Sequence, residues 1–299
     1  MDQINSCKEV TLVKHVPLIA AINDLSGFGR CSLTVAIPIL SSMGYQVCPL
    51  PTALLSAHTG YPDPQVRDFT ADMGAFLAHW DELGLSFDAV FSGFLGNAAQ
   101  VDVLEPFLRR HKERGALCVV DPAMADHGRL YSGGTPELAQ KMRCLVALAS
   151  VTTPNLTEAC LLTDTPYAEV VDEAGVANCK RLHTLGERLL ALGCAAAVIT
   201  GVHTADGMLE NWVFERGCEP RIVHTPRVGK NFAGTGDVFS SVLCGELLHG
   251  EPLFDATERT AAFVCEVTAF TAEADTPLQD GVMFEPFLHR LRRRGNDKK

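Results

Sequence analysis

The chain has no excess of basic residues and no long apolar run. Its 25 Lys and Arg residues are outnumbered by 36 Asp and Glu residues, which gives the 299-residue chain a formal net charge of −11. Because nucleic acids and anionic membranes bind basic surfaces, this balance argues against both kinds of partner. The apolar runs fall short of the roughly 20 residues that span a bilayer. The start of the chain also lacks the basic and then apolar layout of a signal peptide.

Motifs for disulfide and zinc chemistry are missing as well. The 11 cysteines are an odd number, none forms a C-x-x-C pair, and no Cys and His spacing fits a zinc site. Many lie among aliphatic residues, where a free cysteine acts as a small apolar residue: Cys31, Cys48, Cys118, Cys144, Cys194 and Cys265. We therefore expect reduced thiols and a cytoplasmic protein.

Two common nucleotide-binding motifs are absent or incomplete. No Walker A loop, G-x-x-x-x-G-K-[ST], occurs in the sequence. Gly27-Phe28-Gly29 follows the first expected strand, but Ser32 stands where the third glycine of the dinucleotide-binding motif G-x-G-x-x-G belongs. An NAD-binding oxidoreductase is therefore disfavoured. Protection from thermal unfolding by ATP, without an effect of NAD, would separate the two classes.

Short apolar runs alternate with segments of helical length along most of the chain. Strands are expected at 17–24, 46–52, 87–94, 116–122, 151–155 and 195–200. Helices are expected at 31–44, 67–83, 98–114, 136–149, 178–193, 234–250, 258–274 and 285–294. The segments 207–217 and 219–228 interrupt this alternation and are typical of an antiparallel pair joined by a short turn.

This alternation predicts an α/β fold of three layers, α/β/α, with a mostly parallel central sheet and helices on both faces. We expect a single domain over residues 1–299, with a flexible N-terminus at 1–15 and a basic C-terminal tail at 293–299. Ligands of open parallel sheets bind at the carboxyl ends of the strands. Polar residues and glycines follow the expected strands at this edge: Asn23, Asp24, His58, Thr59, Gly93, Asp121, Asn155 and Thr200.

The sequence Gly234-Thr235-Gly236-Asp237 directly precedes an apolar helix. Small residues at a helix start let backbone N–H groups converge on an anion, and the helix dipole adds positive potential. A carboxylate there makes sense if it removes a proton from a hydroxyl group while the amides stabilise a transferring phosphoryl group. A turn in which Asp237 caps the helix is an equally open interpretation of this motif alone.

Three other strand ends carry candidate groups. Thr153-Pro154-Asn155 is followed by Glu158, so that either a capping box or a site with Asn155 on ATP phosphates and Glu158 near Mg²⁺ fits. Asp121 and Asp126 suit a metal–phosphate site, although an ordinary turn also fits them. Thr200-Gly201 ends another strand and offers a hydroxyl group.

The order of these motifs resembles that of the ribokinase-like superfamily, in which a D-P strand end and T-P-N-x-x-E precede a late G-T-G-D. Within it, the chain resembles the vitamin B6 kinases over nearly its whole length. Three segments carry this resemblance, at 56–61 (S-x-H-T-G-Y), 92–94 ([ST]-G-[YF]) and, in outline, 120–128 (V-D-P-x-x-G-D-x-G). The related hydroxymethylpyrimidine kinases usually carry G-T-G-C, whereas Asp237 stands here.

The resemblance implies a homodimeric kinase that uses MgATP to phosphorylate the hydroxymethyl group of pyridoxal, pyridoxamine or pyridoxine, with a monovalent cation as a further candidate cofactor. Asp237 would be the catalytic base, and Gly234, Thr235 and Gly236 would form the anion hole. Candidate ATP-binding residues are Thr153, Asn155, Glu158, Thr200 and Gly201. Candidate metal ligands are Asp121, Asp126 and Glu158. Candidate vitamer-binding residues are Asp24, Ser26, His58, Thr59, Phe94 and Asp237, although core packing also fits Phe94.

The chain departs from the family at the first loop, where residues 23–29 read N-D-L-S-G-F-G and better-known members have a Q-S/G-x-V-G-N type. This leaves the preferred vitamer open. A hydroxymethylpyrimidine kinase of the same fold is disfavoured by the Asp in place of Cys. A sugar kinase of the same fold is disfavoured by the H-T-G-Y loop. A non-catalytic vitamer-binding protein is disfavoured by the set Asp121, Glu158 and Asp237.

Overall fold

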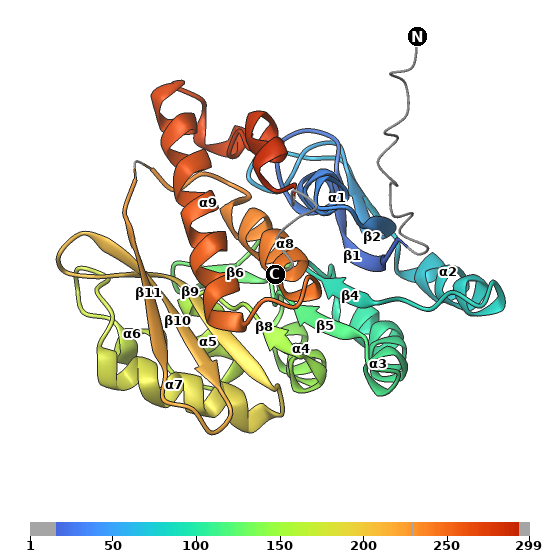
Figure 1. The fold of residues 1–299 in the computed structure, drawn as a ribbon, viewed down its shortest axis with the longest axis horizontal. Helices are drawn as coiled ribbons and strands as arrows, with labels where there is room; N and C mark the ends of the chain where they lie inside the picture. The colour runs from blue at the N-terminus through green and yellow to red at the C-terminus, as the bar shows by residue number, and fades with distance from the viewer. Residues whose placement is uncertain (1–15, 229, 293–299) are drawn as a thin grey trace, which may run out of the picture.

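A computed structural model describes residues 16–228 and 230–292 (Figure 1). Within them, nine strands form one sheet in the order β11 (Arg221–Pro226), β10 (Met208–Glu215), β9 (Ala196–His203), β8 (Val151–Thr152), β5 (Leu117–Val120), β4 (Ala89–Ser92), β1 (Leu18–Ser26), β2 (Gln46–Leu55) and β3 (Val66–Asp68). Neighbouring strands from β9 to β2 are parallel, while β10 and β3 run antiparallel to their neighbours. The mostly parallel sheet and the antiparallel pair after it are confirmed.

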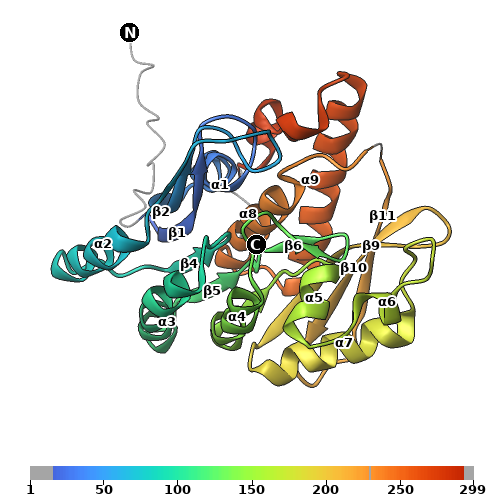
Figure 2. The same cartoon turned by 180° about the vertical axis from the view of Figure 1, so that it is seen from behind.

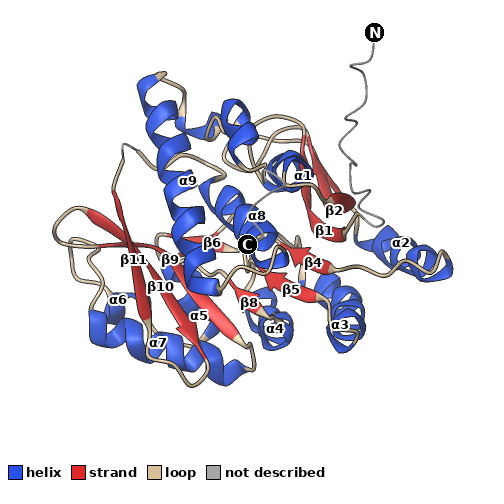
Figure 3. Cartoon of the chain, viewed as in Figure 1, coloured by secondary structure: helices blue, strands red, loops and turns tan. Residues whose placement is uncertain are grey.

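Helices cover both faces of this sheet. One face carries α1 (Ser32–Ser42), α8 (Thr235–Leu248) and α9 (Leu253–Glu273). The other carries α2 (Thr70–Glu82), α3 (Ala98–Glu113), α4 (Pro136–Leu148), α5 (Leu156–Leu162) and α7 (Cys179–Leu192). Figures 1 and 2 show the two faces in turn, and Figure 3 separates the helical layers from the strands. The α/β/α layers that the sequence predicts are therefore present.

The central strands are apolar on both faces because both faces are covered. Along β1, Ile19 and Ala21 pack against α1 and α8, while Ala20 and Ile22 pack in the core of the opposite layer. Successive strand residues point to opposite faces, so that a strand between two helical layers needs apolar residues at every position. No helix in the described part of the chain combines the length and apolarity that crossing a membrane requires.

Some predicted boundaries are wrong. The helix expected at 67–83 begins at Thr70, because residues 66–68 form β3 and pair with the end of β2. The Asp68 carboxylate accepts a hydrogen bond of 2.6 Å from the Thr70 N–H and so stabilises the turn between strand and helix. The helix expected at 285–294 is a 3₁₀ helix, η2 (Glu285–Arg290), the tighter form that short segments adopt.

Short elements were missed, namely α6 (Tyr167–Val170), the 3₁₀ helix η1 (Leu278–Asp280) and a small hairpin of β6 (Ala125–Asp126) and β7 (Arg129–Leu130). Each is too short to show a hydrophobic period in the sequence. The expected flexible N-terminus at 1–15 and basic tail at 293–299 lie outside the described residues.

Two helical glycines give a matched test of this packing. A Cβ on Gly186 of α7 would lie 2.2 Å from the ring of Phe214, whereas a Cβ on Gly74 of α2 would meet nothing within 4 Å. We expect Gly186→Ala to lower the free energy of unfolding by about 1–3 kcal/mol through overpacking. Gly74→Ala should leave it unchanged or raise it by up to about 1 kcal/mol. Urea unfolding measures both, and equal effects would contradict the packing of α7 on β10.

Candidate active site

A cavity of about 680 Å³ lies at the carboxyl ends of the parallel strands, beside the start of α8. The predicted site residues that line it are Asp24, His58, Thr59, Phe94, Asp121, Asp126, Thr153, Asn155, Glu158, Thr200, Gly201, Gly234, Thr235, Gly236 and Asp237. Ser26 differs from them, because it is fully buried and donates its hydroxyl hydrogen bond to Asp24 over 2.9 Å. The structure therefore brings the separate sequence motifs together around one space.

The start of α8 faces this cavity with free amides. Gly234 has a left-handed φ of 73°, and a Cβ there would lie 1.9 Å from the Arg30 carbonyl oxygen, so only glycine fits. The Val238 N–H donates to the Gly234 carbonyl over 2.9 Å and closes the first helical turn. The N–H groups of residues 235–237 precede this bond and have no partner within the helix, at the positive end of its dipole.

The Asp237 carboxylate stands at this helix start. Burial raises its pKa to about 7, and the negative charge of Asp24 adds to the effect, while hydrogen bonds from the Ser32 N–H and the Asn23 amide oppose it. Asn23 Nδ2 lies 3.4 Å from Asp237 Oδ1. A carboxylate with a pKa near neutrality can accept a proton from a hydroxyl group and release it again.

Asn23 was predicted only as a polar residue at a strand end, yet its side chain reaches Asp237. Its Oδ1 accepts hydrogen bonds from the N–H groups of Phe94 (2.8 Å) and Asp24 (3.0 Å). These two donors orient the amide, so that its Nδ2 donates toward Asp237. A Cβ on Gly93 would lie 2.2 Å from that Nδ2, which explains the glycine after β4. The position of Asn23 beside Asp24 was the available signal.

The Asp24 carboxylate is held by two hydroxyl groups. Ser26 donates to its Oδ2 and Ser32 donates to its Oδ1. Burial nevertheless raises the pKa of Asp24, because the two hydrogen bonds only partly offset the loss of water. Ser32 has a left-handed φ of 52°, which is rare for a serine and is typical of a functionally constrained residue. The expected vitamer-binding residue Ser26 thus supports Asp24 from behind.

Asn155 and Glu158 form the capping box that the sequence allowed. The Glu158 N–H donates to Asn155 Oδ1 over 3.0 Å, and the Asn155 N–H donates to Glu158 Oε2 over 2.9 Å. Glu158 Oε1 also accepts from the N–H of Met124 over 3.0 Å. Burial raises the pKa of Glu158 well above its usual value, and the charge of Asp121 adds to this. The capping box therefore includes a buried carboxylate with a raised pKa on the cavity wall.

Asp121 lies buried at the end of β5. Ser240 donates a hydrogen bond of 2.5 Å to Asp121 Oδ2, and its hydroxyl lies 3.1 Å from Thr153 Oγ1. Burial raises the pKa of Asp121 to about 8, and the charge of Asp237 adds to it. Ser240 was not predicted as a site residue, although its place three residues after Asp237 puts both on one face of α8.

The negative charges of Asp121 and Glu158 repel each other, so each carboxylate disfavours ionisation of the other. A divalent cation between two carboxylates offsets such repulsion. Among the described residues, however, no group of three or more His, Cys, Asp or Glu side chains has metal-binding geometry. Asp126 lies on the exposed β6–β7 hairpin at the cavity edge, where its Oδ1 accepts a hydrogen bond of 2.7 Å from the His127 N–H.

Backbone contacts fix the remaining walls. The Thr200 N–H donates to the Pro154 carbonyl over 2.9 Å, and the Gly201 N–H donates to Asn211 Oδ1 over 3.2 Å. Thr59 is exposed and Phe94 is half-buried, so both present atoms to the cavity.

Both ring nitrogens of His58 have partners. Its Nδ1 accepts from the Gly60 N–H over 3.0 Å, which leaves Nε2 to donate to the Gln279 carbonyl over 2.6 Å. His58 therefore holds loop structure as well as lining the cavity.

Solved structures share this fold over nearly the whole chain. A structure described as a phosphomethylpyrimidine kinase of Bacteroides thetaiotaomicron, in a crystal form with pyridoxal, is 38% identical, with a TM-score of 0.87 over 93% of this chain and 96% of that one. Pyridoxal kinase of Lactobacillus plantarum is 31% identical, with a TM-score of 0.83 over 93% and 97%. The expected ribokinase-like fold of the vitamin B6 kinases is confirmed.

Sequence relatives agree. A pyridoxine/pyridoxal/pyridoxamine kinase of Bordetella avium is 30% identical over 275 residues, 86% of each chain. A hydroxymethylpyrimidine/phosphomethylpyrimidine kinase of Salmonella typhimurium is 28% identical over 276 residues, 87% of this chain and 92% of the relative. Residues 80–279 match the family model of phosphomethylpyrimidine kinase. The chain belongs to the phosphomethylpyrimidine kinase family.

Proposed function

We propose that the chain is a MgATP-dependent kinase that phosphorylates the hydroxymethyl group of pyridoxal, pyridoxamine or pyridoxine. The observation that carries this proposal is the Asp237 carboxylate, whose pKa is about 7, beside the free amides of α8 and within one cavity with Asp121 and Glu158. The relatives that are named as vitamin B6 kinases, and the Bacteroides structure with pyridoxal, support the choice of acceptor.

In this reaction, Asp237 accepts the proton of the acceptor hydroxyl as its oxygen attacks the γ-phosphorus of ATP. The bond from that phosphorus to the β,γ-bridging oxygen breaks, and ADP leaves with the bond's electron pair. The N–H groups of Thr235 and Gly236 stabilise the charge on the transferring phosphoryl group. Asn23 keeps the carboxylate of Asp237 oriented through its side-chain amide.

Asp121 and Glu158, with Asp126 at the cavity edge, would hold Mg²⁺, which neutralises phosphate charge. The raised pKa values of the first two support this, since a cation there would offset their repulsion. Thr153, Asn155, Thr200 and Gly201 would contact ATP. We extend the proposal to a cytoplasmic homodimer that can use a monovalent cation, as the resemblance to vitamin B6 kinases implies.

Hydroxymethylpyrimidine is the second candidate acceptor, favoured by the family model and by the Salmonella relative. We expect MgATP consumption with at least one B6 vitamer to exceed that with hydroxymethylpyrimidine, because Asp237 replaces the usual Cys of the pyrimidine kinases. A coupled ADP assay across pyridoxal, pyridoxamine, pyridoxine and hydroxymethylpyrimidine measures this. If only hydroxymethylpyrimidine is turned over, it is the acceptor in place of the B6 vitamers. Vitamer binding without turnover would indicate a non-catalytic protein.

Asp237→Asn should lower kcat by about 10²–10⁴-fold, because it removes positioned proton transfer. The KM values should change little, since the amide keeps the shape of the carboxylate. At pH 8 the melting temperature should stay equal or rise, because the variant removes a charge that burial disfavours. A raised KM with an unchanged kcat in Asp237→Asn would disprove that Asp237 is the catalytic base.

The pH dependence of kcat/KM should follow the ionisation of Asp237. Because the base acts only when deprotonated and its pKa is about 7, kcat/KM should rise as pH rises through about 7 and then level off. Titration of MgATP or of the vitamer would produce a similar limb in any variant. The residual activity of Asp237→Asn is therefore the control, and persistence of the same limb in it would contradict the assignment.

A further inference from the structure

The segment 278–282, here called the clamp, contacts three separate loops around the cavity. It follows α9 and includes η1. The loops are 27–31 after β1, 58–61 after β2, and 231–234 before α8. We infer that the clamp positions the acceptor side of the cavity and that Asp280 is a positioning residue for the acceptor. This inference rests on the proposed function for the identity of the acceptor.

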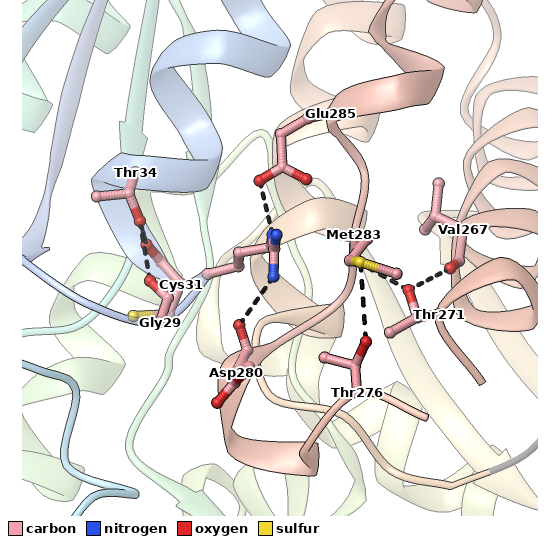
Figure 4. A network of polar contacts seen from close by, with 10 residues as sticks. Gly29, Cys31, Thr34, Val267, Thr271, Thr276, Asp280, Met283 and Glu285 are labelled. Atoms are coloured by element: carbon pink, nitrogen blue, oxygen red, sulfur yellow. Dashed lines mark hydrogen bonds and ion pairs between the residues drawn. The ribbon is translucent and has the colours of Figure 1, made fainter. Parts of the chain in front are cut away.

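The clamp has a rigid base. Val282 is the last residue of the clamp, and Phe284 follows two residues later. Their side chains are 0% and 1% exposed and pack in the core with α1 and α8. The Met283 N–H donates to Thr271 Oγ1 over 2.8 Å, and Thr271 donates to the Val267 carbonyl over 2.6 Å on α9, as Figure 4 shows. Because its base is anchored in two ways, the clamp can hold other segments in place.

The backbone of Arg30 lies between two left-handed glycines. A Cβ on Gly234 would lie 1.9 Å from the Arg30 carbonyl oxygen, and a Cβ on Gly281 would lie 2.7 Å from the same oxygen. The Arg30 N–H donates to the Asp280 carbonyl over 3.1 Å. The position of the clamp is thus transmitted through Arg30 to the anion-binding glycine of α8.

A second backbone connection reaches the same loop. The Ala233 N–H donates to the Leu278 carbonyl over 3.0 Å, and the Val282 N–H donates to the Ala233 carbonyl over 3.3 Å. Ala233 directly precedes Gly234 in the sequence, so the clamp holds the loop before α8 next to its N-cap glycine.

Side chains connect the clamp to the loop 58–61. The Tyr61 hydroxyl donates a hydrogen bond of 2.5 Å to Asp280 Oδ1, and His58 Nε2 donates to the Gln279 carbonyl. The Tyr61 ring lies 4.9 Å from the His58 ring and 5.3 Å from that of Phe28, measured between centroids. Desolvation and the bond to Asp280 raise the pKa of Tyr61 to about 12, so the phenol remains a donor at neutral pH.

Asp280→Ala should raise the KM for the acceptor about tenfold and leave the KM for ATP unchanged. It removes the side-chain hydrogen bond to Tyr61, whereas the backbone hydrogen bonds from the clamp to Arg30 and Ala233 remain. Asp280→Asn should restore most of the wild-type value, since its Oδ1 can still accept from Tyr61. Tyr61→Phe should match Asp280→Ala, and the double variant should show no further loss. Equal changes in both KM values, or additive effects, would overturn the inference.

Glu285→Gln is the matched control. Glu285 pairs with the Arg30 side chain over 2.6 Å at the surface (Figure 4), and exposed ion pairs contribute little. It should leave both KM values unchanged, and a tenfold rise in the acceptor KM would overturn the inference by showing that any contact near Arg30 has the same effect.

Amide hydrogen exchange provides a readout that needs no acceptor. Asp280→Ala should speed exchange in the loops 27–31 and 58–61, while Asp280→Asn should not. Unchanged amide exchange in these loops of Asp280→Ala would overturn the inference about the clamp, even if the proposed kinase activity is found. Faster exchange in a protein without vitamer turnover would keep the clamp and reject only the proposed acceptor.

Discussion

Four carboxylates, Asp24, Asp121, Glu158 and Asp237, share the walls of one cavity, and the cost of keeping their charges away from water is the constraint on which the site depends. Like charges in a partly dry space raise each other's pKa. Each carboxylate therefore needs donors, and the fold supplies them from the end of β1, from the loop after β5 and from helices α1 and α8. A cavity of this kind favours cations and hydrogen-bond donors over free anions, which suits the MgATP that we propose as the phosphoryl donor.

The structure also explains why the loop after β1 resembles a dinucleotide-binding motif. A Cβ on Gly27 would lie 3.0 Å from the Ser56 carbonyl oxygen, and a Cβ on Gly29 would lie 2.3 Å from the His58 ring. These glycines let two loops touch. Ser32, at the third position of the motif, keeps a glycine-like φ of 52° and gives its hydroxyl to Asp24. Gly27, Gly29 and Ser32 thus have a structural role inside this chain that does not depend on a dinucleotide.

Much of the fold could be predicted because periodicity and burial are local properties of a sequence. The apolar β1 and β5 strands and the helices between them follow from runs of residues alone. The strand-end rule also placed Asp24 and Asp121 on one edge of the sheet. Neither rule could give the pairing of β3 with β2, since three exposed residues carry no clear alternation.

Orientation within the site was not predictable for a different reason. Whether Ser26 faces the cavity or supports Asp24 depends on a rotation that the sequence does not record, and the structure places it behind Asp24. The contacts of Arg30 with Gly234 and Gly281 join segments about 200 and 250 residues apart. No local pattern predicts such contacts, yet they decide where the first amides of α8 lie. Short motifs therefore predict which chemical groups the site contains, whereas packing between distant backbone segments determines where those groups lie.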